Sequence, residues 1–159
     1  MRAELEALWP RLWRFAYGLS QNRQDAEDLA QSACVKALQN AGRFKQGTHL
    51  DRWVFTICRN LWRNEVRARK VRVGNGCIPI DDAHPLVEKD ENESNIFASQ
   101  VLSKVMVLPE AQRETVLLVY VEGFSYKEAA AILGIPIGTI MSRLAAARKA
   151  LAPMRATET

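Results

Sequence analysis

The residues best suited to chemistry lie on one helix near the C-terminus, and that chemistry is hydrogen bonding to nucleic acid. An arginine can donate two hydrogen bonds to a guanine edge, whereas serine, threonine and lysine suit phosphates or bases. The start of a helix also leaves free amides that bind phosphate. The positions of this helix that we expect to contact DNA are Thr139, Met141, Ser142, Arg143, Arg148 and Lys149.

The segment around the start of this helix predicts a helix-turn-helix. Ser125 caps a short helix through a capping box, and Gly134 supplies the positive φ that a tight turn needs. Ile137 and Ile140 then return to the core, and the recognition helix begins near Gly138. The alternative is a helical hairpin that binds a protein or no partner. The capping box, together with the basic end of the helix, favours DNA.

A second basic surface is expected on a long helix in the first half of the chain. Thr48 caps this helix. Its predicted buried stripe comprises Leu50, Trp53, Val54, Ile57, Cys58 and Leu61. Its other faces mix Trp62 with amide and basic side chains, which are Arg52, Arg59, Asn60, Arg63, Asn64, Arg67, Arg69 and Lys70.

The distribution of charge supports a polyanionic partner for that surface. From Met1 to Val73 there are 14 Lys and Arg against 7 Asp and Glu, a net charge of +7. Gly74–Lys104 carries −4 and the remainder of the chain carries +1. A solvated basic face with no partner is the alternative on charge alone. The excess in the first half predicts a nucleic acid.

Few other residues could carry chemistry. The chain has three cysteines, which are Cys34, Cys58 and Cys77, and none of them forms a Cys-x-x-Cys motif. This odd number indicates a protein of a reducing compartment and not one held by disulfide bonds. His49 and His84 have no metal-ligand spacing to a cysteine, so we expect neither a metal nor another cofactor. The sequence shows no catalytic set of carboxylates, histidine and serine and no phosphate-binding glycine loop, nor about 20 consecutive apolar residues. We therefore expect a cytoplasmic protein that is not an enzyme and has no small-molecule substrate.

Helical periodicity runs through almost the whole chain, so the predicted fold class is all-α. A first helix covers about Ala3 to Leu19, with Gly18 near its end. Asn22 caps a second helix, whose apolar stripe includes Leu38. The last helix before the helix-turn-helix runs from Glu110 to about Val121, and its second half is too apolar all round for an exposed helix, so we expect it to be central to the core.

Residues 74–95 have no periodicity and are rich in acids, glycine and proline. This composition predicts a flexible acidic linker. The expected architecture is therefore two small helical domains, 1–73 and 96–159, joined by that linker, with the helix-turn-helix in the second. Domains of this size bury only a marginal core each.

Three stretches of the sequence resemble the extracytoplasmic-function (ECF, group IV) sigma factors of bacterial RNA polymerase, in the sigma-70 family. The first is DAEDLAQ at residues 25–31 and the second is WVFTICRN at residues 53–60. The third begins with LPEAQR at residue 108, continues with GFSYKEAA at residue 123 and ends with GIPIGTIMSRL at residues 134–144. They follow the family's order, with a linker between them as in the family, and the resemblance covers nearly the whole chain.

The resemblance implies an alternative sigma factor that binds core RNA polymerase and directs promoter-specific transcription initiation. The first domain would be region 2-like, and the second would be region 4-like, reading the −35 element and meeting the polymerase β flap. The residues that match the family's contact with the β′ clamp helices are Asp25, Glu27, Asp28, Leu29 and Gln31. Those that match its contact with the −10 element of promoter DNA are Phe44, Lys45, Arg59, Asn60 and Arg63.

Four positions qualify this assignment. Trp53 also matches a −10 position, but its place on the apolar stripe favours the core. Met141 stands where the family commonly has a basic residue, and Ala145 and Ala146 replace larger polar residues, so fewer base contacts are expected.

The family resemblance also implies a partner, an anti-sigma factor that holds the protein inactive until a stress signal arrives and that is often anchored in the membrane. The competing function is an autonomous helix-turn-helix transcriptional regulator. Such a regulator would carry a dimerisation or ligand domain, and the sequence offers neither heptad repeats nor a sensory pocket.

Overall fold

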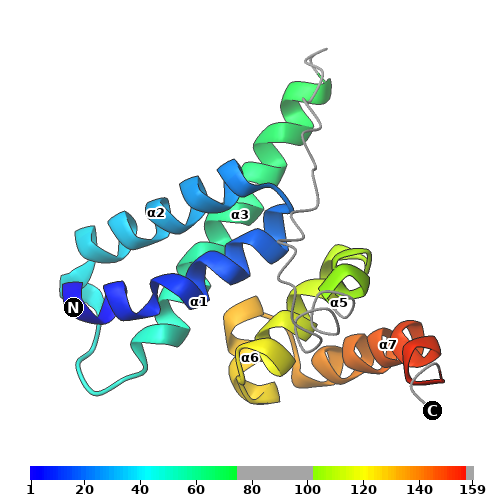
Figure 1. Cartoon of the computed structure of the whole chain (residues 1–159). Helices are drawn as coiled ribbons and strands as arrows, with labels where there is room; N and C mark the ends of the chain where they lie inside the picture. Colours follow the sequence, from blue (N-terminus) through cyan, green and yellow to red (C-terminus); the bar gives the residue numbers. More distant parts are fainter. Residues whose placement is uncertain (75–101, 157–159) are drawn as a thin grey trace, which may run out of the picture. The chain divides into compact units, whose positions relative to one another are not determined.

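The computed structural model describes residues 1–74 and 102–156, and all of its regular elements there are helical (Figure 1). The predicted linker, the first residues of the predicted second domain, Cys77 and His84 lie outside these ranges. The chain divides into two compact units, Met1–His84 and Pro85–Thr159. The prediction of an all-α protein with two helical domains is confirmed.

The first unit is a bundle of three helices: α1 (Arg2–Ser20), α2 (Arg23–Gln39) and α3 (Leu50–Gly74). A short 3₁₀ helix, η1 (Ala41–Arg43), follows α2. Helices α1 and α2 lie side by side and antiparallel, and the last turns of α3 extend beyond them (Figure 1). The facing residues of α2 are small, which lets the two helices approach closely; they are Ala26, Ala30, Ala33 and Ala37, all fully buried.

The ends of α1 and α2 follow from local chemistry. The Asp25 amide donates to Asn22 Oδ1 at 3.0 Å, as the predicted cap requires. Helix α1 ends at Gln21, which adopts the left-handed conformation with φ 57°, whereas Gly18 lies buried inside the helix. The predicted cap at Thr48 is wrong, because its hydroxyl donates to the Lys45 carbonyl at 2.6 Å and α3 begins at Leu50.

The buried face of α3 is rotated from the predicted stripe. Phe55 and Trp62 are buried together with Val54 and Cys58, while Trp53 is only half-buried. The cause is tertiary, since the Phe55 ring packs against Phe15 of α1 with 5.1 Å between ring centroids. The prediction that Trp53 belongs to the core is therefore wrong.

The second unit has a helical stretch at residues 102–106, followed by α5 (Glu110–Val116) and a π-helical turn, η2 (Leu117–Val121). The prediction of one helix from Glu110 to about Val121 holds in extent but not in geometry. The Glu122 amide donates to the Leu117 carbonyl at 2.9 Å, five residues back, which defines the wider turn. Leu117 and Leu118 are fully buried in it.

The helix-turn-helix consists of α6 (Tyr126–Leu133) and α7 (Ile137–Ala156). Ser125 Oγ accepts a hydrogen bond from the Glu128 amide at 3.1 Å, and Gly134 ends α6 with φ 66°. The recognition helix begins at Ile137, slightly earlier than predicted. Ile140 is buried as expected, but Ile137 is exposed, so its predicted place in the core is wrong.

Among the described residues, no single helix is long and apolar enough to cross a membrane. Helices α6 and α7 pass that test of length and composition only as a pair, and they meet at a bend of 105°.

Candidate nucleic-acid interface

The outer face of α7 gathers most of the residues predicted to contact the −35 element. Met141, Ser142, Arg148 and Lys149 are exposed, and Thr139 is half-buried. The opposite face of the helix holds Ile140, Leu144 and Ala147 in the core. This division is what a helix needs to present side chains to a groove while its other side is fixed by packing.

Arg143 differs from the other predicted contacts, because it is engaged inside the unit. Its Nη1 lies 3.5 Å from Glu114 Oε1 of α5, and the side chains of Arg143 and Glu114 are 24% and 7% exposed. A carboxylate this deeply buried is stable when a cation stands beside it. The structure therefore ties the recognition helix to α5 through Arg143.

Ser142 is exposed but has already used its donor. Its hydroxyl donates to the Gly138 carbonyl at 3.0 Å, one turn earlier in α7. The serine oxygen keeps its lone pairs, so it can accept a hydrogen bond from a base or another donor. In this conformation Ser142 suits a base edge that carries an amino group.

The first unit presents an aromatic and basic surface around the start of α3. Phe44 and Trp53 are both half-buried, and their rings pack against each other with 5.2 Å between centroids. The cations and amide predicted for the −10 element lie on the same loop and helix: Lys45, Asn60 and Arg63 are exposed and Arg59 is half-buried. Half-exposed rings can stack on unpaired bases, and cations on the same loop and helix can attract phosphates.

The residues of α2 predicted to contact polymerase differ in their exposure. Glu27, Asp28 and Gln31 are exposed, whereas Leu29 lies in the core. Asp25 Oδ2 lies 3.0 Å from Arg69 Nη2 of α3. Arg69 also lies over the Trp62 ring and bonds Glu65 at 3.0 Å, so Asp25 joins a cluster that holds α3 against the start of α2.

Two exposed apolar residues of α2 were not among the polymerase contacts predicted from the sequence. Val35 and Leu38 are exposed, and the prediction that Leu38 belongs to the buried stripe is wrong. Their spacing from Gln31, four and seven residues, places them on the same face of the helix. The sequence signal that could have identified them as contact candidates is the presence of two apolar residues on an otherwise polar helix face.

Other chemistry has little support in the described part of the chain. Burial raises the pKa of the Cys34 and Cys58 thiols, and Cys34 raises that of Cys58 further, so both thiols are poor nucleophiles. Within residues 1–74 and 102–156, no three His, Cys, Asp or Glu side chains are grouped to hold a metal ion.

Comparison with known proteins decides the family. The chain matches Sigma-70 region 2 over residues 5–72 and Sigma-70 region 4 over residues 99–151. The ECF RNA polymerase sigma factor EcfG of Rhodopseudomonas palustris is 36% identical over 154 residues, covering 97% of this chain and 84% of the relative. The chain belongs to the ECF sigma factors. It is therefore an alternative sigma factor of the sigma-70 family, and its helix-turn-helix is the DNA-binding element of region 4.

Further relatives agree with this assignment of the sigma factor. ECF sigma factor SigM of Mycobacterium tuberculosis is 31% identical, covering 89% of this chain and 70% of the relative. The sigma factor RpoE of Bartonella quintana, solved in complex with the anti-sigma factor NepR, has a TM-score of 0.79 and 33% identity, covering 99% of this sigma factor and 98% of that chain. The residues predicted to contact polymerase and the −10 element lie within the region 2 match, and those predicted to contact the −35 element lie within the region 4 match.

Proposed function

We propose that this sigma factor binds core RNA polymerase and directs it to promoters by contacting both the −10 and the −35 elements. The observation that carries the proposal is the presence of two different DNA-suited surfaces in one chain. One is the aromatic and basic surface of α3 and its preceding loop, and the other is the polar face of α7. An autonomous regulator would need only the second surface.

The first surface suits the melted strand of the −10 element. The Phe44–Trp53 pair offers ring faces for unpaired bases, and each stacked base contributes about 1–3 kcal/mol. Lys45 on the loop and Arg59, Asn60 and Arg63 on α3 add donors for phosphates and base edges. The second surface suits the duplex of the −35 element, because a recognition helix fits the major groove.

The core polymerase contact is proposed for the exposed face of α2. Glu27 and Gln31 share that face with the apolar side chains of Val35 and Leu38. A mixed polar and apolar surface of this kind is typical of interfaces that form and dissociate. Asp25 and Leu29 support this face from beneath, through the Arg69 ion pair and the core respectively.

An anti-sigma factor is proposed as the partner that keeps the protein inactive. The support is the Bartonella quintana sigma factor, which matches nearly the whole of this chain and was solved in complex with an anti-sigma factor. The sigma factor would then act in the cytoplasm, where it is released to polymerase, and a membrane-anchored anti-sigma factor would tether it. A stress signal would trigger that release.

A run-off transcription assay with purified core polymerase tests the proposal. We expect promoter-dependent transcripts with the wild-type protein, loss of core binding for Val35→Asp, and retained core binding with impaired promoter opening for Asn60→Ala. Permanganate footprinting measures opening, and co-elution with core measures binding. A protein that binds DNA without binding core would be an autonomous regulator, and the proposal would be rejected.

A further inference from the structure

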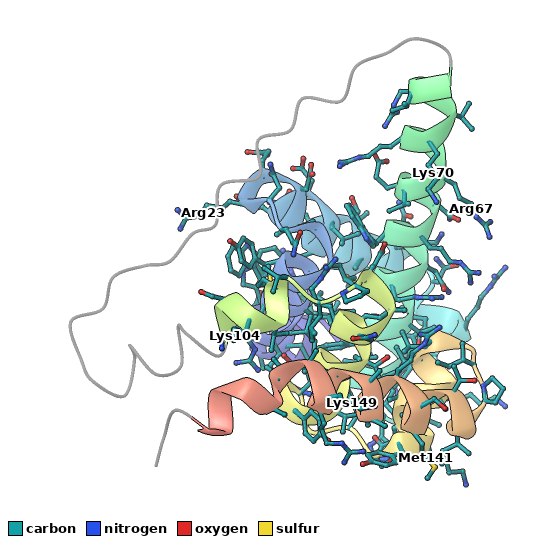
Figure 2. All side chains as sticks on the ribbon, turned by 90° about the vertical axis from the view of Figure 1, so that its right-hand side faces the viewer. Arg23, Arg67, Lys70, Lys104, Met141 and Lys149 are labelled. Atoms are coloured by element: carbon teal, nitrogen blue, oxygen red, sulfur yellow. The ribbon has the colours of Figure 1, made fainter. Side chains whose placement is uncertain are left out.

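Two apolar side chains are exposed at the start of α7, the helix that carries the polar residues predicted to contact DNA. Ile137, in the first turn, is 48% exposed, and Met141, one turn later, is 53% exposed. Their spacing of four residues makes them neighbours on the helix surface. Figure 2 shows Met141 directed outward from α7, with Lys149 further along the same helix.

These two residues are not part of the buried core of the second unit. The inner side of α7 is formed by Ile140, Leu144 and Ala147, which are fully buried against the rest of the unit. Met141 lies away from that side, whereas Ile137 lies seven residues before Leu144 and is exposed in the first turn of the helix. The first turns of a recognition helix are the part that contacts base edges.

We propose that Met141, with Ile137 beside it, packs against the C5 methyl group of a thymine in the −35 element. This inference rests on the proposed function, in which α7 enters the major groove. The thymine methyl is the apolar group that the bases present in that groove, and it is read by apolar side chains. The methionine thioether is flexible and polarizable, so it can adapt to the methyl at the groove floor.

The surroundings of the pair favour DNA over an apolar protein partner. Ser142 is exposed directly beside Met141, and Arg148 lies seven residues after Met141, on the same face of α7. Lys149 adds a second exposed cation. An apolar partner would have to bury these cations, whereas a groove lined by phosphates meets them with opposite charge.

The test replaces single thymines by uracil, which removes the methyl group and leaves every hydrogen-bonding group of the base in place. A promoter is first selected with the wild-type holoenzyme from a library randomised over the −35 element. Each thymine of the selected element, on either strand, is then replaced in turn, and holoenzyme affinity is measured by competition. We expect a loss of about fourfold at one thymine, which corresponds to about 0.8 kcal/mol for one buried methyl.

Variants of Met141 assign that loss to the side chain. In Met141→Ala the loss at that thymine disappears, and in Met141→Leu, which keeps an apolar side chain, most of it remains. Both replacements are good helix formers, so α7 is retained. Equal affinity for every uracil-substituted promoter, or the same loss in Met141→Ala, overturns the inference. A library that yields no −35 sequence rejects the proposed function instead. If Met141→Ala loses a protein partner and no uracil substitution has an effect, Ile137 and Met141 form a protein contact.

Discussion

Each unit contains an ion pair between two helices, and the two pairs differ in depth. In the first unit, Asp25 of α2 and Arg69 of α3 lie 3.0 Å apart, with side chains 26% and 39% exposed. In the second unit, Glu114 of α5 and Arg143 of α7 lie 3.5 Å apart, with side chains 7% and 24% exposed. The shorter pair is therefore the one more open to water.

Depth determines what each pair contributes. Exposed ion pairs contribute about 0–1 kcal/mol, because water already solvates both charges. Removing one partner of a buried pair costs about 3–5 kcal/mol, because the other charge stays away from water. We infer that packing of residues such as Phe55 contributes far more to the position of α3 than its ion pair does, whereas at α7 the buried ion pair adds substantially to the packing of Ile140 and Leu144.

The largest effect is expected from Glu114→Gln. This change removes the buried charge beside Arg143, and we expect it to destabilise the second unit by about 2 kcal/mol, less than a fully buried pair because Arg143 remains partly hydrated. Hydrogen exchange of α5 and α7 peptides in the full chain measures the loss.

Glu128→Gln is the matched control, because it removes the same charge from the half-exposed surface of α6. It should cost no more than about 0.5 kcal/mol, mainly from the lost interaction with the helix dipole. Equal losses of hydrogen-exchange protection in Glu114→Gln and Glu128→Gln would show that the burial of Glu114 does not make its charge more important for stability.

A smaller effect is expected at the exposed pair. A double-mutant cycle with Asp25→Asn and Arg69→Met should give a coupling energy of about 0.5 kcal/mol in urea unfolding. Core polymerase affinity is measured on the same variants. If Asp25 only supports α2, both single variants weaken core binding slightly and alike. A large loss for Asp25→Asn alone would show that its carboxylate contacts polymerase directly.

The smallest effect concerns the dependence of stability on pH. The hydrogen bond from Arg69 is the main cause that lowers the pKa of Glu65 in the folded protein. A lowered folded pKa means that Glu65 stabilises the fold above its unfolded pKa and loses this contribution as pH falls through the folded value. Glu65 is 41% exposed, so the contribution is small.

The measurement compares urea midpoints of the wild type and Glu65→Gln between pH 7 and pH 3. We expect a small stability difference at pH 7 that narrows as the pH falls below about 4, where free glutamate titrates. Glu27→Gln, an exposed carboxylate on α2, serves as the control. A difference that widens toward acid would contradict the assigned role of Arg69.

Features set by neighbouring residues could be predicted from the sequence. The cap at Asn22, the cap at Ser125 and the left-handed Gly134 each depend on a few adjacent positions, and all three are present in the structure. The family also followed from local motifs. The roles of individual residues in DNA and polymerase binding remain predictions.

Features set by distant residues could not be predicted in the same way. Helix α3 is apolar on more than one side, so periodicity alone could not decide between Trp53 and Trp62 for the core; the neighbouring helices decide it. Arg143 looked like a free cation on α7, but its partner Glu114 lies 29 residues earlier in the chain. The π-helical turn after α5 likewise carries no sequence signature of its own.

The separation between Glu114 and Arg143 also has a consequence in time. A ribosome that adds about 5–20 residues per second makes Glu114 roughly 1–6 s before the Arg143 that joins it. Because α5 reaches its final environment only when α7 packs against it, the recognition helix is the piece that completes the second unit. A newly made chain therefore gains a stable second unit and its DNA-reading surface in the same event, which is the packing of α7 against α5. A truncated product without α7 lacks both the DNA-reading surface and the stability of the second unit.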